Sequence, residues 1–309
     1  MEKQLPRVYL AVIVATLLFA PVLIAEAQMK PGASVKTLTL GLVFYGPREP
    51  VEERFRPLVE YAGRKLSPAG DTKCTVIIAP SAMQLLKLID EGRVDFYLES
   101  PYPTYVINRS GAANILLRRW KSGMSEYRSV IFTSKESGIA QLSDLRGKMI
   151  AFEDAGSTSG YFLPKLWLFQ KRFLVLEKPG LEAKVPPTEI GYIFATSVKN
   201  IVNLVVQQKV AAGAISNDDY ANLDDKRKPL VSILSETESL PRHLVSVRRD
   251  LPEPVVKRLK DILLSMHEDG EGQKILRQTD NTTKFDLLPG GEEGFRRKLM
   301  ELYRPRQSK

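Results

Sequence analysis

Three hydroxyl side chains follow one another where an apolar helix is expected to begin. Residues 156–160 read Gly-Ser-Thr-Ser-Gly, and Pro164 places the helix start a few residues earlier, because proline is not tolerated deep inside a helix. The first turn of a helix has backbone N–H groups without partners and carries the positive end of the helix dipole. Together with the hydroxyls of Ser157, Thr158 and Ser159, these donors can bind an oxyanion. The hydroxyls can also serve as simple helix caps, so composition alone leaves both interpretations open.

Other polar residues are expected at the carboxyl ends of strands, where open parallel sheets bind their ligands. Glu99 beside Ser100 could hold a ligand amine or a protonated ligand oxygen, or could form a salt bridge. Asn217, Asp218 and Asp219 could contact a ligand or cap the helix that they precede, and Lys199 and Arg48 could neutralise an anion or lie on the surface. The predicted ligand-binding residues are Ser157, Thr158, Ser159, Gly160, Tyr161, Tyr45, Glu99, Ser100, Tyr102, Lys199, Asn217 and Asp218.

The sequence lacks the motifs of common enzymes. The serines do not match the Gly-x-Ser-x-Gly nucleophile elbow, and the phosphate-binding Gly-x-x-x-x-Gly-Lys-Ser/Thr spacing does not occur. His243 and His267 are the two histidines, and neither has neighbours that resemble a catalytic triad. With one cysteine, Cys74, the chain has too few ligands for a zinc site and no internal disulfide. We therefore expect no catalytic residue, no metal and no cofactor.

The first residues have the features of a secretory signal peptide. Lys3 and Arg7 precede an apolar stretch over residues 8–25, and the chain then reads Ala-Glu-Ala. We expect cleavage after residue 27 and secretion of the remainder. An uncleaved membrane anchor is the alternative, against which Pro21 and the small residues of the cleavage site argue.

The formal net charge of +9 comes from basic residues scattered among acids. A nucleic-acid partner is therefore not expected, and the positive field instead favours small anionic ligands.

Two lobes are predicted from the order of the elements. Strands and helices alternate along most of the chain, which indicates an α/β fold of mainly parallel sheets flanked by helices. We expect residues 37–133 and 240–305 to form lobe 1 and residues 134–239 to form lobe 2. The chain would then cross twice between the lobes, making a hinge, with a ligand cleft between them.

Several segments together resemble the phosphonate-binding family of periplasmic ABC-transporter proteins, over nearly all of residues 37–305. They are residues 40–43 (Leu-Gly-Leu-Val), 95–101 (Asp-Phe-Tyr-Leu-Glu-Ser-Pro), 144–148 (Asp-Leu-Arg-Gly-Lys), 157–161 (Ser-Thr-Ser-Gly-Tyr) with Pro164, and 208–214 (Gln-Lys-Val-Ala-Ala-Gly-Ala). The resemblance implies a two-lobed type II periplasmic binding protein fold. It also implies that Ser157, Thr158 and Ser159 grip the oxygens of a phosphonate or phosphate.

Three positions bear on which ligand this family resemblance implies. Many members have a histidine just before the helix that begins here near Lys199, where this chain reads Ser-Val-Lys-Asn. Glu99 stands where aminoethylphosphonate binders carry a tyrosine, and an acid there would suit a ligand amine or a monoprotonated oxyanion. Asp218 lies near a family position that contacts a ligand amino group.

The expected function is that of a periplasmic, monomeric, non-enzymatic solute-binding protein. It would capture a small phosphorus oxyanion (phosphonate, phosphate or phosphite) and deliver it to an ABC permease in the inner membrane. One alternative is a sulfonate or thiamine-precursor binder on the same fold. Another is a ligand sensor that docks on a membrane signalling protein.

Overall fold

The computed structural model describes residues 36–44, 49–67 and 71–303. The expected signal peptide, Tyr45 and Arg48 lie outside these residues.

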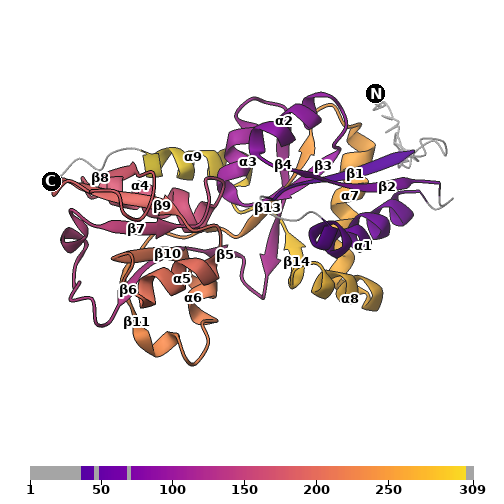
Figure 1. Cartoon of the computed structure of the whole chain (residues 1–309). Helices are drawn as coiled ribbons and strands as arrows, with labels where there is room; N and C mark the ends of the chain where they lie inside the picture. Colours follow the sequence, from indigo (N-terminus) through magenta and orange to yellow (C-terminus); the bar gives the residue numbers. More distant parts are fainter. Residues whose placement is uncertain (1–35, 45–48, 68–70, 304–309) are drawn as a thin grey trace, which may run out of the picture. The chain divides into compact units, whose positions relative to one another are not determined.

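The described residues contain two six-stranded sheets (Figure 1). The first sheet has the order β14-β4-β13-β3-β1-β2. Its strands are β1 (Thr37–Val43), β2 (Lys73–Ala79), β3 (Phe96–Glu99), β4 (Ala113–Lys121), β13 (His243–Arg248) and β14 (Thr282–Asp286). β1 pairs in parallel with β2 and β3, whereas β13, β4 and β14 continue the sheet with antiparallel pairs.

The second sheet has the order β11-β6-β10-β7-β9-β8. Its strands are β6 (Ser129–Ser134), β7 (Met149–Phe152), β8 (Leu174–Glu177), β9 (Glu189–Phe194), β10 (Ala212–Ser216) and β11 (Val231–Glu236). β10, β7, β9 and β8 are parallel, and β6 and β11 are antiparallel additions. The predicted α/β class, with two sheets flanked by helices, is confirmed.

Helices follow most of the parallel strands. The first lobe's sequence contributes α1 (Glu49–Leu66), α2 (Ala82–Asp90) and α3 (Pro101–Asn108), and the second contributes α4 (Leu163–Gln170), α5 (Val198–Val206) and α6 (Asn217–Ala221). The C-terminal helices are α7 (Glu253–Ser265), α8 (Gly270–Gln278) and α9 (Gly291–Tyr303). α5 is strongly amphipathic, so Ile201, Val202 and Val205 are buried against β6 and β10 while Lys199 stays exposed.

The chain passes between the sheets beside a short two-stranded pair. β5 (Glu126–Tyr127) and β12 (Leu240–Pro241) pair antiparallel, with Leu240 opposite Tyr127. β6 (Ser129–Ser134) is already a member of the second sheet, whereas the expected boundary placed all but its last residue in lobe 1.

The C-terminal helices pack in two ways. Leu259 of α7 and Ile275 of α8 share a core with Leu38 of the first sheet, as expected for helices that return to lobe 1. Phe295 of α9 instead shares a core with Leu166 of α4, and Leu244 of β13 lies in the same cluster. α9 therefore shares a core with a helix that flanks the second sheet and with a strand of the first sheet.

Candidate functional site

A cavity of about 660 Å³ is lined by residues from both sheets. Its lining consists of Val43, Phe44, Glu99, Ser100, Pro103, Lys121, Tyr127, Glu153, Asp154, Ala155, Gly156, Ser157, Thr158, Ser159, Phe194, Thr196, Asp219, Arg242 and His243. This volume is in the range of small-molecule sites.

The Ser-Thr-Ser segment forms the first turn ahead of α4. The Ser157 hydroxyl accepts a hydrogen bond from the Gly160 N–H at 2.9 Å and donates one to Glu153 Oε2 at 2.8 Å. The N–H of Phe162 donates to the Ser157 carbonyl at 3.0 Å, a wide turn that leaves the N–H groups of Thr158 and Ser159 without an acceptor inside the helix. These two N–H groups are therefore available as donors at the cavity.

Gly160 is required by the close approach of Glu153. A Cβ atom at position 160 would lie 2.6 Å from Glu153 Cβ and 2.7 Å from its Oε2. The two backbones are also joined, because the Glu153 N–H donates to the Gly160 carbonyl at 3.0 Å. Glycine thus lets the turn pack directly on the residue that follows strand β7.

Thr158 joins the turn to the first sheet. Its hydroxyl donates to Ser100 Oγ at 2.9 Å and accepts from the Tyr102 N–H at 2.9 Å. Ser100 and Tyr102 lie at the start of α3, directly after strand β3. The ends of two strands from different sheets therefore meet at Thr158.

Glu99 is a buried carboxyl at the end of β3, with 9% of its surface exposed. It accepts hydrogen bonds from the N–H groups of Val43 and Ser100. Burial raises the pKa of Glu99 to about 8, although the two backbone hydrogen bonds act in the opposite direction. Glu99 is therefore mostly protonated at pH 7 and can donate a hydrogen bond to an oxyanion.

Three more carboxyls line the cavity, and of these only Asp219 was considered as a ligand contact from the sequence. Burial raises the pKa of Glu153 to about 7, and the nearby Asp154 and Asp219 add to this rise. Burial also raises the pKa values of Asp154 and Asp219. The cavity wall is consequently rich in groups that accept hydrogen bonds but resist full ionisation.

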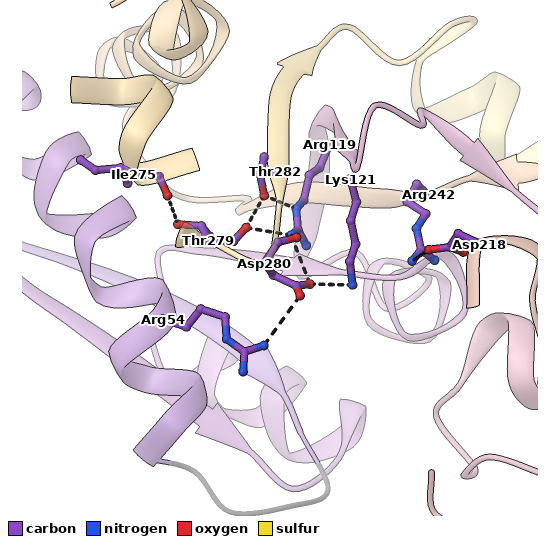
Figure 2. A network of polar contacts seen from close by, with 9 residues as sticks. All are labelled: Arg54, Arg119, Lys121, Asp218, Arg242, Ile275, Thr279, Asp280 and Thr282. Carbon is purple, nitrogen blue, oxygen red and sulfur yellow. Dashed lines mark hydrogen bonds and ion pairs between the residues drawn. The ribbon is translucent and has the colours of Figure 1, made fainter. Parts of the chain in front are cut away.

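Two basic side chains at the cavity each have an acidic partner. Arg242 Nη2 lies 2.5 Å from Asp218 Oδ2, and the Arg242 guanidinium carbon lies 4.5 Å from the ring centre of Tyr127. Lys121 Nζ lies 2.8 Å from Asp280 Oδ2. Figure 2 shows these two ion pairs as separate groups, with Lys121 directed towards Asp280.

Asp280 is the centre of a larger network (Figure 2). Its carboxylate also lies 3.3 Å from Arg119 Nη2 and 3.7 Å from Arg54 Nη1. Arg119, with 1% of its surface exposed, donates from Nε to Thr282 Oγ1 at 2.7 Å and from Nη2 to the Thr279 carbonyl at 3.1 Å. This network joins β4 to β14 and includes Lys121, which lines the cavity.

Five of the twelve predicted residues are brought together at the cavity. They are Ser157, Thr158, Ser159, Glu99 and Ser100. Of the other seven, Tyr45 lies outside the described residues. The remaining six are not among the lining residues: Gly160, Tyr161, Tyr102, Lys199, Asn217 and Asp218.

Local contacts explain where these remaining residues lie. The Tyr102 ring stacks on Phe162 with centroids 4.5 Å apart, and the Tyr161 hydroxyl accepts from Lys165 Nζ at 2.9 Å. Asn217 accepts from the Arg128 N–H at 3.0 Å. Asp218 serves the cavity indirectly, as the ion-pair partner of Arg242.

The sequence held a signal for some of the unpredicted residues. Glu153 and Asp154 directly follow β7, so the strand-end rule that selected Glu99 would have selected them as well. Lys121 ends β4, which runs in the same direction as β3 because both pair antiparallel with β13, so the strand-end rule applies to Lys121 as well. His243 begins β13 and reaches the cavity only because β13 pairs antiparallel with its neighbours. That pairing is not encoded in any local pattern.

A family model described as "ABC transporter, phosphonate, periplasmic substrate-binding protein" matches residues 40–288. The chain belongs to this family. Membership gives it the role of a substrate-binding protein, implies a small ligand and a permease partner, and indicates a periplasmic location. Within the described ranges, no helix combines the length and apolar character needed to cross a bilayer.

Solved structures of similar proteins support the same fold. XAC2383 from Xanthomonas citri, bound to chloride ion, has a TM-score of 0.80 at 28% identity, over 87% of this chain and 96% of that chain. The same protein bound to ATP has a TM-score of 0.77 at 28% identity, with the same coverage. PhnD1 from Prochlorococcus marinus, in complex with methylphosphonate, has a TM-score of 0.65 at 16% identity, over 86% of this chain and 97% of that chain. The fold is that of a type II periplasmic binding protein.

Proposed function

We propose that this protein captures a small phosphorus oxyanion (phosphonate, phosphate or phosphite) and delivers it to an ABC permease in the inner membrane. One observation carries the proposal. The hydroxyl-rich turn at residues 157–159 lines the same cavity as Ser100 and Glu99, in a chain of the phosphonate-binding family.

The oxyanion would bind at the first turn ahead of α4. It would accept hydrogen bonds from the N–H groups of Thr158 and Ser159 and from the Ser159 hydroxyl. The existing bonds of Ser157 to Glu153 and of Thr158 to Ser100 keep the turn in place, so little reorganisation is needed.

The protonation state of Glu99 makes this site compatible with an anion. A carboxylate at this position would repel the ligand, whereas the protonated carboxyl that burial favours can donate a hydrogen bond to it. Affinity should therefore weaken as the pH rises through about 8, the pKa of Glu99.

A thermal-shift screen of residues 28–309 tests the ligand class. The panel would contain phosphate, phosphite, methylphosphonate, aminoethylphosphonate, sulfate, taurine, a thiamine precursor and ATP, the last because XAC2383 was solved with it. A ligand at a hundred times its Kd should add about 2.7 kcal/mol to the free energy of unfolding. A shift with a phosphorus compound supports the proposal, and a shift with taurine or the thiamine precursor alone would assign the site to the alternative ligands.

A serine double variant tests the turn itself. Ser157→Ala/Ser159→Ala should weaken methylphosphonate binding at least about tenfold, because two hydroxyls of the turn are removed. Loss of the Ser157 cap alone should lower the free energy of unfolding by roughly 1 kcal/mol. Ser81→Ala is the matched control, because Ser81 caps α2 in the same way and does not line the cavity. Equal methylphosphonate affinity in the double variant and in Ser81→Ala would show that the hydroxyls of this turn do not bind the ligand.

Delivery to a permease is tested by uptake. Cells that lack the gene should accumulate less labelled methylphosphonate than cells that carry it. Binding by the purified protein with unchanged uptake would instead favour a sensory role.

A further inference from the structure

Two residues of the cavity wall at the start of β13 have buried polar atoms without hydrogen-bond partners in the part of the chain that the structure describes. Among the described residues, no hydrogen-bond partner is present for Arg242 Nε or His243 Nδ1. Arg242 has 5% of its surface exposed, and both residues line the cavity. Because buried polar atoms are nearly always satisfied, these two atoms indicate that a further group binds here.

Tyr127 links this wall to the hydroxyl turn. Its ring lies against the Arg242 guanidinium, 4.5 Å from ring centre to guanidinium carbon, and is stacked with the His243 ring at a centroid distance of 6.5 Å. Burial raises the pKa of the Tyr127 hydroxyl, and the nearby Thr158 side chain acts in the opposite direction. Arg242 and the turn are therefore separated by about one tyrosine side chain, a span that a small organic molecule can bridge.

The charges at this wall argue against a second anionic group on the ligand. Arg242 is already neutralised by Asp218, and Lys121 by Asp280. Glu153 and Asp219 face the same cavity, and each interacts electrostatically with Arg242. A neutral group that both accepts and donates hydrogen bonds fits this surface. Its oxygen can accept a hydrogen bond from Arg242, and its O–H can donate one to a carboxyl oxygen.

His243 fits the same chemistry. Burial and the nearby charges of Arg119, Arg242 and Lys121 hold the pKa of His243 well below its usual value. The ring is therefore neutral at pH 7, with one nitrogen as donor and the other as acceptor, which suits a hydroxyl group.

We infer that Arg242 and His243, with Glu153 and Asp219, form a second subsite for hydroxyl groups on the organic part of the ligand. The preferred ligand is then a phosphonate or phosphate monoester with a hydroxylated carbon chain, rather than a bare oxyanion. The cavity of about 660 Å³ has room for both parts. The inference rests on the proposed phosphorus-oxyanion function and extends it.

The test compares two phosphonates that differ only in hydroxyl groups. Calorimetry would measure the Kd of 2,3-dihydroxypropylphosphonate, propylphosphonate and methylphosphonate for the full mature protein. The dihydroxy compound should bind at least about tenfold more tightly than propylphosphonate, as expected for one or two hydrogen bonds to buried groups. Arg242→Lys keeps the charge that faces Asp218 but removes the Nε donor, and it should reduce this ratio to below about threefold. His243→Phe keeps the ring and should do the same.

Arg249→Lys is the matched control, because Arg249 is exposed and lies outside this cavity. It should keep the wild-type ratio. If Arg242→Lys does not fold, His243→Phe and the wild-type ratio still decide the question. Methylphosphonate binding with a wild-type ratio near one would overturn the subsite and leave the proposed function standing, with water as the partner of these atoms. If none of the three phosphonates binds, the subsite falls; if phosphate and phosphite also fail to bind, the proposed function falls with it.

Discussion

Two buried arginines of the first lobe make opposite use of their hydrogen-bonding capacity. Arg119 donates to Thr282, to two backbone carbonyls and to Asp280, and the carboxylate of Asp280 is in turn shared with Lys121. Arg242 has one ionic partner, Asp218, and its Nε atom has none among the described residues. The satisfied arginine holds two strands together, whereas the unsatisfied one lines the cavity. Within this pair, the arginine with incomplete bonding is the one placed to contact a ligand.

The largest expected effect comes from breaking the satisfied network. Arg119→Met should lower the free energy of unfolding by about 3–5 kcal/mol, because it removes the donor to Thr282 Oγ1 and to the Asp280 carbonyl and takes one cation from the Asp280 carboxylate. Adding Asp280→Asn should not restore stability, since Arg119 also bonds to groups other than Asp280. Urea denaturation measures both variants. A loss below about 1 kcal/mol would contradict the structural role of this network.

A buried carboxyl without an ion pair should make stability depend on pH. The pKa of Glu99 is raised from 4.5 to about 8, so the folded state keeps a proton that the unfolded state releases between these values. The free energy of unfolding therefore falls as the pH rises from about 4.5 to 8. Glu99→Gln should remove this fall and be more stable than the wild type by about 2–4 kcal/mol at pH 8.5.

Thermal unfolding between pH 4 and pH 9 measures this difference. Glu53→Gln, on the exposed side of α1, is the control and should leave the pH profile unchanged. Parallel profiles for Glu99→Gln and the wild type would show that Glu99 titrates normally.

The arginine of the cavity should be replaceable without loss of stability. Arg242→Met/Asp218→Leu removes both charges and the unsatisfied Nε atom, and should change the free energy of unfolding by roughly 0 to +2 kcal/mol. Arg242→Met alone should be destabilising, because it leaves Asp218 buried and unpaired. A double variant as unstable as Arg119→Met would erase the contrast between the two arginines.

The smallest effect is expected at the exposed edge of the network. Arg54 Nη1 lies 3.7 Å from Asp280 Oδ1, and 44% of the Arg54 side chain is exposed. Arg54→Ala should lower the free energy of unfolding by less than about 0.5 kcal/mol, because solvent screens the pair. A larger loss, measured by urea denaturation beside Arg119→Met, would show that the network extends to the surface.

The sequence predicts the fold class because strand and helix patterns alternate clearly along most of the chain. It does not predict β8 (Leu174–Glu177) or β14 (Thr282–Asp286), which are short edge strands whose pairing comes from the neighbouring strand. The antiparallel direction of β13 between β3 and β4 is equally invisible in local patterns, because it depends on where the chain returns.

The same distinction explains which site residues could be predicted. Ser157, Thr158, Ser159, Glu99 and Ser100 follow parallel strands, and the strand-end rule locates them. Arg242 and His243 reach the cavity beside and on β13, which runs antiparallel to its neighbours, so no spacing in the sequence identifies them. Asp218 is linked to the cavity through its ion pair with Arg242.

The contact between Gly160 and Glu153 has a consequence for how such sequences diverge. Any side chain at position 160 would meet the Glu153 side chain at less than 3 Å, so a substitution there becomes tolerable after position 153 has become smaller. Substitutions at positions 153 and 160 should therefore be correlated among homologous sequences. A homologue in which only position 160 has changed is expected to have a different turn here, and with it a different ligand.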